Sequence, residues 1–357
     1  MRELDSAEAL HIQVARHFRG LIREGRLRPG QRLRPLRQIA HELGASINPV
    51  QTAFRALERE GLVHRRHGIG VFVGEAQVRL PATLEIGVLF RCVPAWRERD
   101  NYLLHLFAGV HGALERDEHR TLLVTVPTEQ RPLRELPTQF RDNPAHAYIV
   151  DEPFSDKIVA KLAEAGRPVM VVNRRPDVDG VSATTMDNYA AGVETARQML
   201  ARGHLAVGFC GADQWNSRQV MAGFLDTMEE AGAPVPVSRI GVLNVSRDDP
   251  RLYFRQVMAT SPTAVYFGND RLARSFYMWA ADVGLRIPQD VSVVGCLDLR
   301  LAAELSPPLT TVRFDPEEMG RRAVQELIAL CETPGRAPVH AALPGEWVER
   351  ESLAPAP

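Results

Sequence analysis

Hydrophobic positions in the first 75 residues recur at the spacing of helices and then at that of two short strands. Helical spacing runs over residues 6–24 and again over 36–43. A third helix is predicted to begin at Asn48-Pro49, because Asn is a good N-cap and Pro is tolerated in the first turn. Residues 62–66 and 71–73 are predicted to be strands. This order predicts a helix-turn-helix followed by a β-hairpin, which is a winged helix.

Polar side chains occupy the surfaces with which such a module contacts a polyanion. The exposed face and N-terminal end of the third helix carry residue types that hydrogen-bond phosphates and base edges. The hairpin tip is basic and contains glycine, so it can lie against a sugar-phosphate backbone. The predicted DNA contacts are Ser46, Asn48, Gln51, Thr52, Arg55, His67, Gly68 and Gly70.

Short apolar strands alternate with amphipathic helices after residue 83, and residues 75–83, which lack periodicity, are predicted to be a linker. The predicted strands are 86–90, 121–126, 147–150, 169–173, 206–210, 241–245, 264–267 and 291–295, and the helices 102–117, 155–165, 189–202, 218–231, 252–259 and 271–283. Nearly continuous apolar strands indicate parallel sheets covered on both faces. We therefore expect an α/β fold of two lobes over residues 84–350, preceded by a winged-helix domain over residues 1–74.

Charge is distributed unevenly along the 357 residues. Residues 1–80 carry a net charge of +6 and the remainder −7, which gives −1 for the whole chain. A basic module on an acidic body indicates that only the first part meets a polyanion. Charge alone would equally fit a solvated face, and a winged helix can also serve protein interaction. The surplus of arginine favours double-stranded DNA as the partner.

Several other classes of protein are disfavoured. No apolar run reaches the roughly 20 residues that a membrane span needs, and the acidic start lacks the features of a signal peptide. The four cysteines are far apart, which favours reduced thiols in a cytoplasmic protein over a metal or redox site. These cysteines are Cys92, Cys210, Cys296 and Cys331. A solute-binding protein of a transporter would have a signal peptide and would lack a DNA-binding domain, and the sequence fits neither expectation.

An enzymatic function and a cofactor are not expected. Pyridoxal phosphate needs a lysine Schiff base, and the only lysines are Lys157 and Lys161. They lie four residues apart on a predicted helix, where surface solvation explains them. No serine nucleophile elbow, phosphate-binding loop or metal-ligand cluster is present in the sequence.

Residues 10–74 resemble the N-terminal domain of the GntR family. The resemblance rests on the stretches GRLRPGQRL, LRQIAHELGAS and NPVQTAFRALEREGLVHRRHGIGVFV. It implies that Arg37 contacts DNA and that Ser46 binds phosphate, and we add Arg34, which stands where the family usually has proline. Ile47 and Gln51 replace residues that are often arginine. Phosphate anchoring is therefore expected, while the operator sequence cannot be carried over.

Residues 84–350 resemble the effector domain of the LacI/GalR family, which is similar to periplasmic sugar-binding proteins. The resemblance rests on RPVMVVNRRP, TTMDNYAAGVETARQMLARGHLAVGFCG, AVYFGNDRLARSFYMWAADVGLRIPQDVSVVG and SPPLTTVRFDPEEMGRRAVQELI. It implies two lobes joined by three crossing segments, a small-molecule effector between them, and a homodimer. A GntR reader on a LacI-type sensor resembles the chimeric, arabinose-responsive repressors.

Candidate effector contacts follow the ends of predicted strands or match the family's ligand-facing positions. They are Trp96, Tyr102, Asn173, Trp215, Arg218, Asn269, Asp270 and Asp298. Two departures stand out: Val220 replaces the usual arginine, and Leu297 replaces the aspartate that accepts from a sugar hydroxyl. The effector is therefore a sugar, or a less polar or differently charged molecule, or the cleft no longer binds one. The sequence predicts a ligand-controlled transcription regulator, most simply a repressor, whose response to the effector is not readable from residues.

Overall fold

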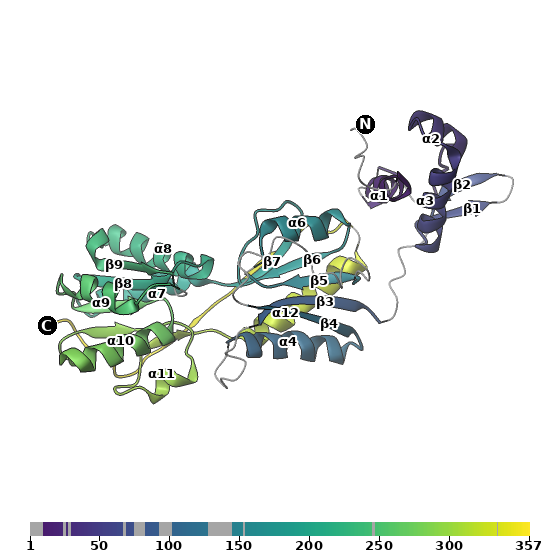
Figure 1. Cartoon of the computed structure of the whole chain (residues 1–357). Coiled ribbons are helices and arrows are strands. Elements are labelled where there is room, and N and C mark those ends of the chain that lie inside the picture. Colours follow the sequence, from purple (N-terminus) through teal and green to yellow (C-terminus); the bar gives the residue numbers. More distant parts are fainter. Residues whose placement is uncertain are drawn as a thin grey trace.

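The computed structural model describes residues 10–23, 26–27, 30–66, 69–74, 83–92, 102–127, 145–152, 154–244, 247–333 and 335–357. Figure 1 shows a small N-terminal unit and two larger α/β lobes. The lobes are named here by their order in the chain: the N-lobe contains the strand that begins at residue 85, and the C-lobe the strand that begins at residue 207.

The N-terminal unit is a winged helix. Its elements are α1 (Leu10–Arg23), α2 (Leu36–Glu42), α3 (Ile47–Arg59), β1 (Val63–Arg66) and β2 (Gly70–Val73). Apolar residues of all five elements form one core. In it the rings of Phe18 and Phe54 pack edge to face, with their centroids 4.8 Å apart. The prediction that Asn48 is the N-cap of α3 was wrong by two residues, because the N-cap is Ser46 and the helix begins at Ile47. The side chain of Ile47 packs against the core, which favours its place in the first turn of α3.

The N-lobe is built on a parallel sheet in the order β13-β7-β6-β5-β3-β4. Its strands are β3 (Glu85–Cys92), β4 (Arg120–Pro127), β5 (Ala147–Val150), β6 (Val169–Val172), β7 (Ser182–Met186) and β13 (His340–Leu343), and its helices are α4 (Tyr102–Arg116), α6 (Asp156–Glu164) and α12 (Pro316–Glu332). Alternate residues of a strand point to opposite faces. Val88 and Phe90 accordingly pack beneath α4 and α12, while Leu89 packs beneath α6.

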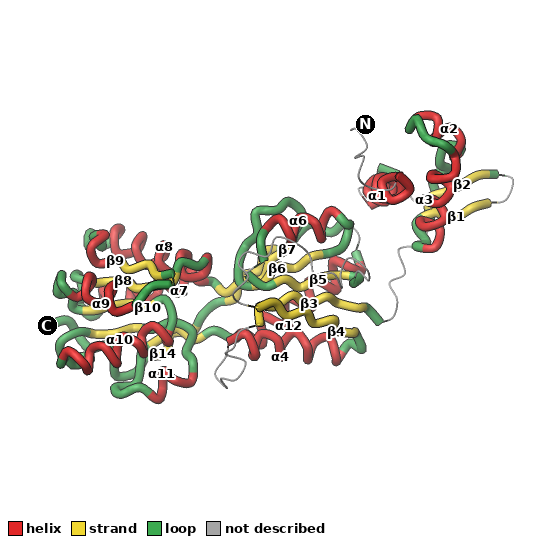
Figure 2. The backbone as a smooth tube through the Cα atoms, viewed as in Figure 1, coloured by secondary structure: helices red, strands yellow, loops and turns green. Residues whose placement is uncertain are grey.

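The C-lobe repeats this plan on a smaller parallel sheet, in the order β11-β10-β8-β9. Its strands are β8 (Val207–Ala212), β9 (Ile240–Leu243), β10 (Ala264–Phe267) and β11 (Ser292–Val294), and its helices are α7 (Asn188–Ala201), α8 (Trp215–Glu230), α9 (Pro250–Met258), α10 (Asp270–Val283) and the short α11 (Arg300–Glu304). Tyr266 of β10 faces the core beneath α7 and α8, and Phe267 faces the core beneath α9 and α10. Helices thus cover both faces of each sheet (Figure 2).

Three segments cross between the lobes. The first joins β7 to α7, the second joins β12 (Thr311–Arg313) to α12, and the third joins β13 to β14 (Glu346–Val348). Strands β12 and β14 pair antiparallel, so two of the crossings support each other. The sequence pattern missed β7, whose buried residues include Ser182, Thr184 and Thr185, because polar side chains hide the apolar signature of a buried strand.

In each lobe two helices cross at close range through glycine. A Cβ atom at Gly109 of α4 would collide with the backbone carbonyl of Glu317 in α12, and one at Gly223 of α8 would collide with that of Tyr189 in α7. These crossings leave no room for a side chain at either glycine. They fix α4 against α12 and α7 against α8.

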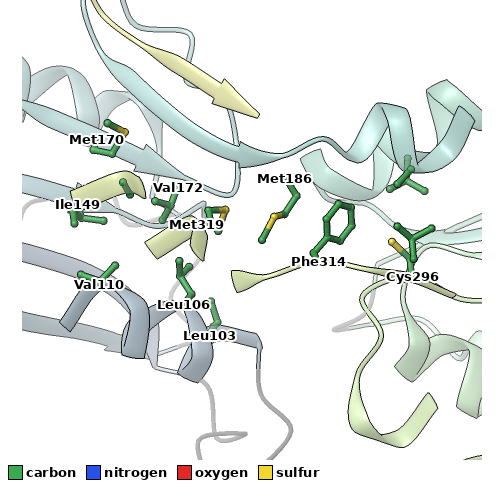
Figure 3. Packing of buried hydrophobic residues seen from close by; sticks show 14 of the residues in the cluster. Leu103, Leu106, Val110, Ile149, Met170, Val172, Met186, Cys296, Phe314 and Met319 are labelled. Atoms are coloured by element: carbon green, nitrogen blue, oxygen red, sulfur yellow. The ribbon is translucent and has the colours of Figure 1, made fainter. Parts of the chain in front are cut away.

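An apolar cluster runs from one lobe into the other. It contains Leu103 and Leu106 of α4, the crossing residues Met186 and Phe314, and Cys296 of the C-lobe. In Figure 3 the side chains of Met186 and Phe314 lie between the N-lobe residues and Cys296. The lobes therefore share a hydrophobic core at the crossings, which ties their relative position to side-chain packing.

The chain beyond residue 350, which the predicted boundary left outside the effector domain, packs on the C-lobe. The Ser352 hydroxyl donates to the carbonyl of Val293, and the His204 ring bridges the Thr263 hydroxyl and the carbonyl of Ala354. His204 is thus a structural residue that holds the C-terminal tail.

Candidate DNA-binding surface and interlobe site

Helix α3 separates its core face from a polar face, as the sequence pattern predicts. Val50, Phe54 and Leu57 are buried, whereas Thr52 and Arg55 are exposed on the other side. Ser46 and Asn48 are exposed at the N-terminal end of α3, and Gln51 is half-buried. The N-terminal end of a helix presents backbone N–H groups and a positive dipole end, which suits a phosphate.

The two arginines near α2 differ in their surroundings. Arg37 is exposed, and within the described residues it forms no ion pair. Arg34 is exposed too, but its Nη1 atom lies 2.8 Å from both carboxylate oxygens of Glu42. Of these two predicted contacts, Arg34 thus has a carboxylate partner in the structure, while Arg37 is exposed without one among the described residues.

The wing is a short antiparallel hairpin whose tip is only partly described. Arg66 of β1 places its guanidinium over the ring of Phe72, 4.9 Å from the centroid. Gly70 has φ of 145°, a conformation that favours glycine, and it is partly exposed. The predicted contacts His67 and Gly68 lie outside the described residues.

On the N-lobe, two of the predicted effector contacts lie in one hydrogen-bonded chain. The Tyr102 hydroxyl donates to Oδ1 of Asn173 over 2.6 Å, and Nδ2 of Asn173 donates to Oδ1 of Asp151 over 2.7 Å. Burial, together with the nearby charges of Asp151 and Glu152, raises the pKa of Tyr102 well above its usual value. Asn173 directly follows β6 and has φ of 70°. The chain of bonds holds three polar groups in fixed orientations.

On the C-lobe, Asn269 and Asp270 are largely engaged by the protein itself. Oδ1 of Asn269 accepts from the backbone N–H of Leu272 and caps α10. Asp270 is fully buried, and its carboxylate accepts from the Leu299 N–H and the Thr311 hydroxyl at 2.7 and 2.8 Å. Burial raises the pKa of Asp270 from 3.8 to about 7. The geometry makes Asp270 a support that joins α10 to the crossing strand β12.

Asp298 lies in a strained loop after β11 and is held by two arginines. Leu297 and Asp298 both have positive φ, 105° and 50°, which side chains rarely adopt. The carboxylate accepts from Nε of Arg313 and from Nη2 of Arg350, each at 2.7 Å. Because Arg313 lies in β12 and also contacts Glu346 of β14, Asp298 connects this loop to the crossings between the lobes.

Trp215 meets the opposite lobe through its backbone. Its N–H, in the first turn of α8, donates to Oε1 of Glu152 at the end of β5, over 3.3 Å. The N-cap residue Gln214 supplies no side-chain cap to α8. A carboxylate of the N-lobe therefore caps a helix of the C-lobe.

The remaining predicted contacts are placed differently. Arg218 is exposed and directs its guanidinium to Oδ1 of Asp213, at 2.5 Å from Nη2. Trp96 lies outside the described residues. Val220 is buried in the apolar cluster, and Leu297 packs against that cluster. The two positions at which the sequence departs from the family pattern thus place apolar side chains in or against this cluster.

Sequence reasoning missed Asp151, Glu152 and Arg174. Each follows the end of a parallel strand, β5 or β6, where binding residues of α/β folds gather, and this position was the available signal. Arg174 donates to Oδ1 of Asp156 at 2.5 Å and to the carbonyl of Phe154 at 2.7 Å. It braces the loop that carries Glu152.

Two family models match separate parts of the chain. Residues 10–73 match the bacterial regulatory proteins of the gntR family, and residues 196–353 match a periplasmic binding protein-like domain. The two matches agree with the predicted order, in which a gntR-type helix-turn-helix domain comes before a periplasmic binding protein-like domain. No described helix is both long and apolar enough to cross a membrane.

The relatives with similar sequences are transcriptional repressors. The chain is 23% identical over 338 residues to the arabinose metabolism transcriptional repressor of Geobacillus stearothermophilus, and the match covers 90% of this chain and 91% of that protein. It is 29% identical over 214 residues to the repressor PurR of Escherichia coli O1:K1 / APEC, covering 57% of this chain and 62% of PurR. Among solved structures, the complex of the regulator CelR with cellobiose has a TM-score of 0.66 at 18% identity. It covers 90% of this chain and all of that one, and indicates a shared fold.

Proposed function

Because this chain joins a winged helix of the gntR family to a periplasmic binding protein-like domain, we propose that it is a transcriptional repressor controlled by a small molecule. The winged helix binds operator DNA, and the effector binds between the lobes. The observation that supports the effector part is a group of polar residues that follow strands or begin helices of the two lobes. Tyr102 and Asn173 of the N-lobe are hydrogen-bonded to each other, and Glu152 of the N-lobe contacts Trp215, which begins a helix of the C-lobe.

Control requires that the effector bind one arrangement of the lobes better than another. Three chain crossings join the lobes, and the carboxylate of Glu152 in the N-lobe accepts a hydrogen bond from Trp215 in the C-lobe. A change in lobe arrangement can therefore occur at the crossings and would alter this bond. The effector shifts the lobes, the N-lobes move relative to each other in a dimer, and the spacing of the winged helices changes. In this scheme effector binding weakens operator binding.

The proposed effector combines hydrogen-bonding groups with an apolar portion. Tyr102 and Asn173 offer polar groups, while Leu297, which is partly exposed and packs against the same cluster as Tyr102, offers apolar surface. A sugar fits the polar part, and cellobiose is bound by the regulator CelR, which has a similar fold. A less polar metabolite fits Leu297 better than a sugar does, because a leucine side chain accepts no hydrogen bond from a hydroxyl.

The finer parts of the proposal concern organisation. We place the DNA-binding domain at residues 1–74, the linker at 75–83 and the effector domain from residue 84, and we propose a homodimer that binds a two-fold symmetric operator. A protein that binds operator DNA works in the bacterial cytoplasm. We propose no catalytic role and no cofactor.

The proposal is tested with the full chain and the DNA upstream of its own gene. Wild-type protein is titrated against this DNA and against a scrambled fragment at several salt concentrations. A sequence-selective, salt-sensitive shift is expected, and equal binding to both fragments would refute the DNA-binding part. A thermal-shift screen of sugars and related metabolites then tests the effector part, since a ligand that binds only the folded state raises the melting temperature. A hit must also change the affinity for the DNA.

A further inference from the structure

The segment that leads into α2 lies beside β2 of the wing and is hydrogen-bonded to it through a single antiparallel bridge. The N–H of Leu33 donates to the carbonyl of Val71 over 2.8 Å, and the N–H of Val73 donates to the carbonyl of Gln31 over 2.8 Å. Arg32, between these two bonds, pairs antiparallel with Phe72. The wing is therefore anchored along β2 to the residues that precede the helix-turn-helix.

The side chain of Arg32 extends this anchor to the wing tip. Its Nη2 atom donates to the carbonyl of Ile69 over 2.5 Å. A Cβ atom at Gly70 would lie 3.1 Å from Nε of Arg32, so the guanidinium packs along the backbone at the position where Gly70 has a positive φ. Arg32 and Gly70 fit each other, and this contact fixes the course of the chain as it enters β2.

The charge of Arg32 is not neutralised by this contact. Arg34 and Arg65 of the same domain contact the carboxylates of Glu42 and Glu58. Within the described part of the chain, Arg32 instead binds a carbonyl, which carries no formal charge, and its residue is exposed. A guanidinium has five N–H donors, so groups remain for a phosphate.

We propose that Arg32 positions the wing on DNA: it holds Ile69 and Gly70 through its contact with the backbone and donates its remaining N–H groups to a phosphate of the operator. Ile69, 54% exposed, is then held at the surface that meets the sugar-phosphate backbone. This inference rests on the proposed DNA-binding function. It assigns a wing-positioning role to a residue outside the recognition helix α3.

Two variants of Arg32 and one control separate positioning from charge. Arg32→Met removes both the donor and the charge, while Arg32→Lys keeps the charge and loses the planar fork. Arg59→Met is the matched control, because Arg59 is exposed at the far end of α3. The full chain is bound to the DNA upstream of its own gene, and each variant is melted first to show that the domain stays folded.

The decisive readout distinguishes wing contacts from those of α3. Hydroxyl-radical cleavage reports protection of the sugar backbone, and dimethyl sulfate reports protection of guanine N7 in the major groove. For Arg32→Met we expect affinity about tenfold weaker, consistent with one charged hydrogen bond and one phosphate contact. Part of the backbone protection should be lost while guanine protection remains. Arg32→Lys should fall between this variant and wild type, and Arg59→Met should stay within about twofold of wild type.

Other outcomes overturn the inference. Wild-type affinity and an unchanged backbone footprint for Arg32→Met would show that Arg32 does not position the wing. Loss of both kinds of protection would show that Arg32 supports the whole domain. If Arg32→Met does not fold, wild-type behaviour of Arg32→Lys in both footprints would still refute the role of the planar fork. If the wild-type protein itself shows no selective binding, the proposed function fails and this inference with it.

Discussion

Oε1 of Glu152 lies 3.3 Å from the backbone nitrogen of Trp215, and this bond joins the end of β5 in the N-lobe to the start of α8 in the C-lobe. The remaining interlobe connections described above are covalent crossings or apolar packing. A charged acceptor at a helix N-terminus is favoured by the helix dipole. The bond therefore biases the lobes toward the arrangement in which these two residues meet.

Replacing Glu152 with glutamine should loosen this arrangement. Glutamine keeps an oxygen acceptor but removes the charge, so the bias should fall by about 0.5–1 kcal/mol. Spin labels at the exposed positions Lys157 and Leu252 report the distance between the lobes. The distance distribution should broaden toward longer values in Glu152→Gln and stay unchanged in Glu164→Gln, an exposed position on α6. Identical distributions for wild type and Glu152→Gln would contradict the role of this bond.

Asp270 should make the stability of the protein depend on pH. Its pKa in the folded protein, raised by burial to about 7, exceeds its ordinary value of 3.8. The folded state therefore binds this proton more tightly, and the free energy of unfolding falls as pH rises from about 4 to 7. The slope is at most about 1.4 kcal/mol per pH unit for one group.

The test for Asp270 is urea unfolding at pH 5 and pH 8. Asp270→Asn should lose less stability between the two pH values than wild type does, because the amide does not titrate. Asp282→Asn, an exposed change on the same helix, should keep the wild-type difference. An equal loss in wild type and Asp270→Asn would show that Asp270 does not titrate in this range.

The close crossing of α4 and α12 should not tolerate a methyl group at Gly109. A Cβ atom there would collide with the backbone carbonyl of Glu317, so Gly109→Ala should destabilise the protein by about 1–3 kcal/mol. Gly112 lies on the same helix with nothing within 4 Å of such an atom. Gly112→Ala should therefore be neutral or stabilising by up to about 1 kcal/mol, since alanine favours helix. Chemical unfolding measures both, and equal effects would refute the close crossing.

Removing the charge of Glu42 should strengthen DNA binding. Glu42 holds Arg34 at 2.8 Å, and its own charge repels phosphate. Glu42→Gln should improve the affinity for operator DNA by about two- to tenfold and make it more sensitive to salt. Glu60→Gln serves as the control, because Glu60 also pairs with an arginine, Arg19, but follows the far end of α3. A weaker or unchanged affinity for Glu42→Gln would place Arg34 away from the DNA.

Much of the fold follows from local patterns that the sequence states directly. The apolar positions of α3, such as Val50 and Phe54, and the apolar strands β5 and β10 were placed correctly because each buries one continuous or periodic face. Strand β7 was missed because its threonines are buried by contacts with distant parts of the chain, so the strand has no hydrophobic pattern in the sequence. The start of α8 at Trp215 was placed three residues late, since its cap comes from Glu152 in another lobe.

The sequence by itself determined which side of α3 is buried and which is polar and exposed, because a helix is a short-range structure whose faces follow from residue spacing. Only the tertiary structure decided how the candidate effector residues are used. Tyr102 and Asn173 come together from separate strands and helices, whereas Asp270 and Asp298 are taken up by Thr311, Arg313 and Arg350 of distant segments. The physical reason is that a buried carboxylate needs donors, and their positions are set by the folded chain rather than by its local sequence.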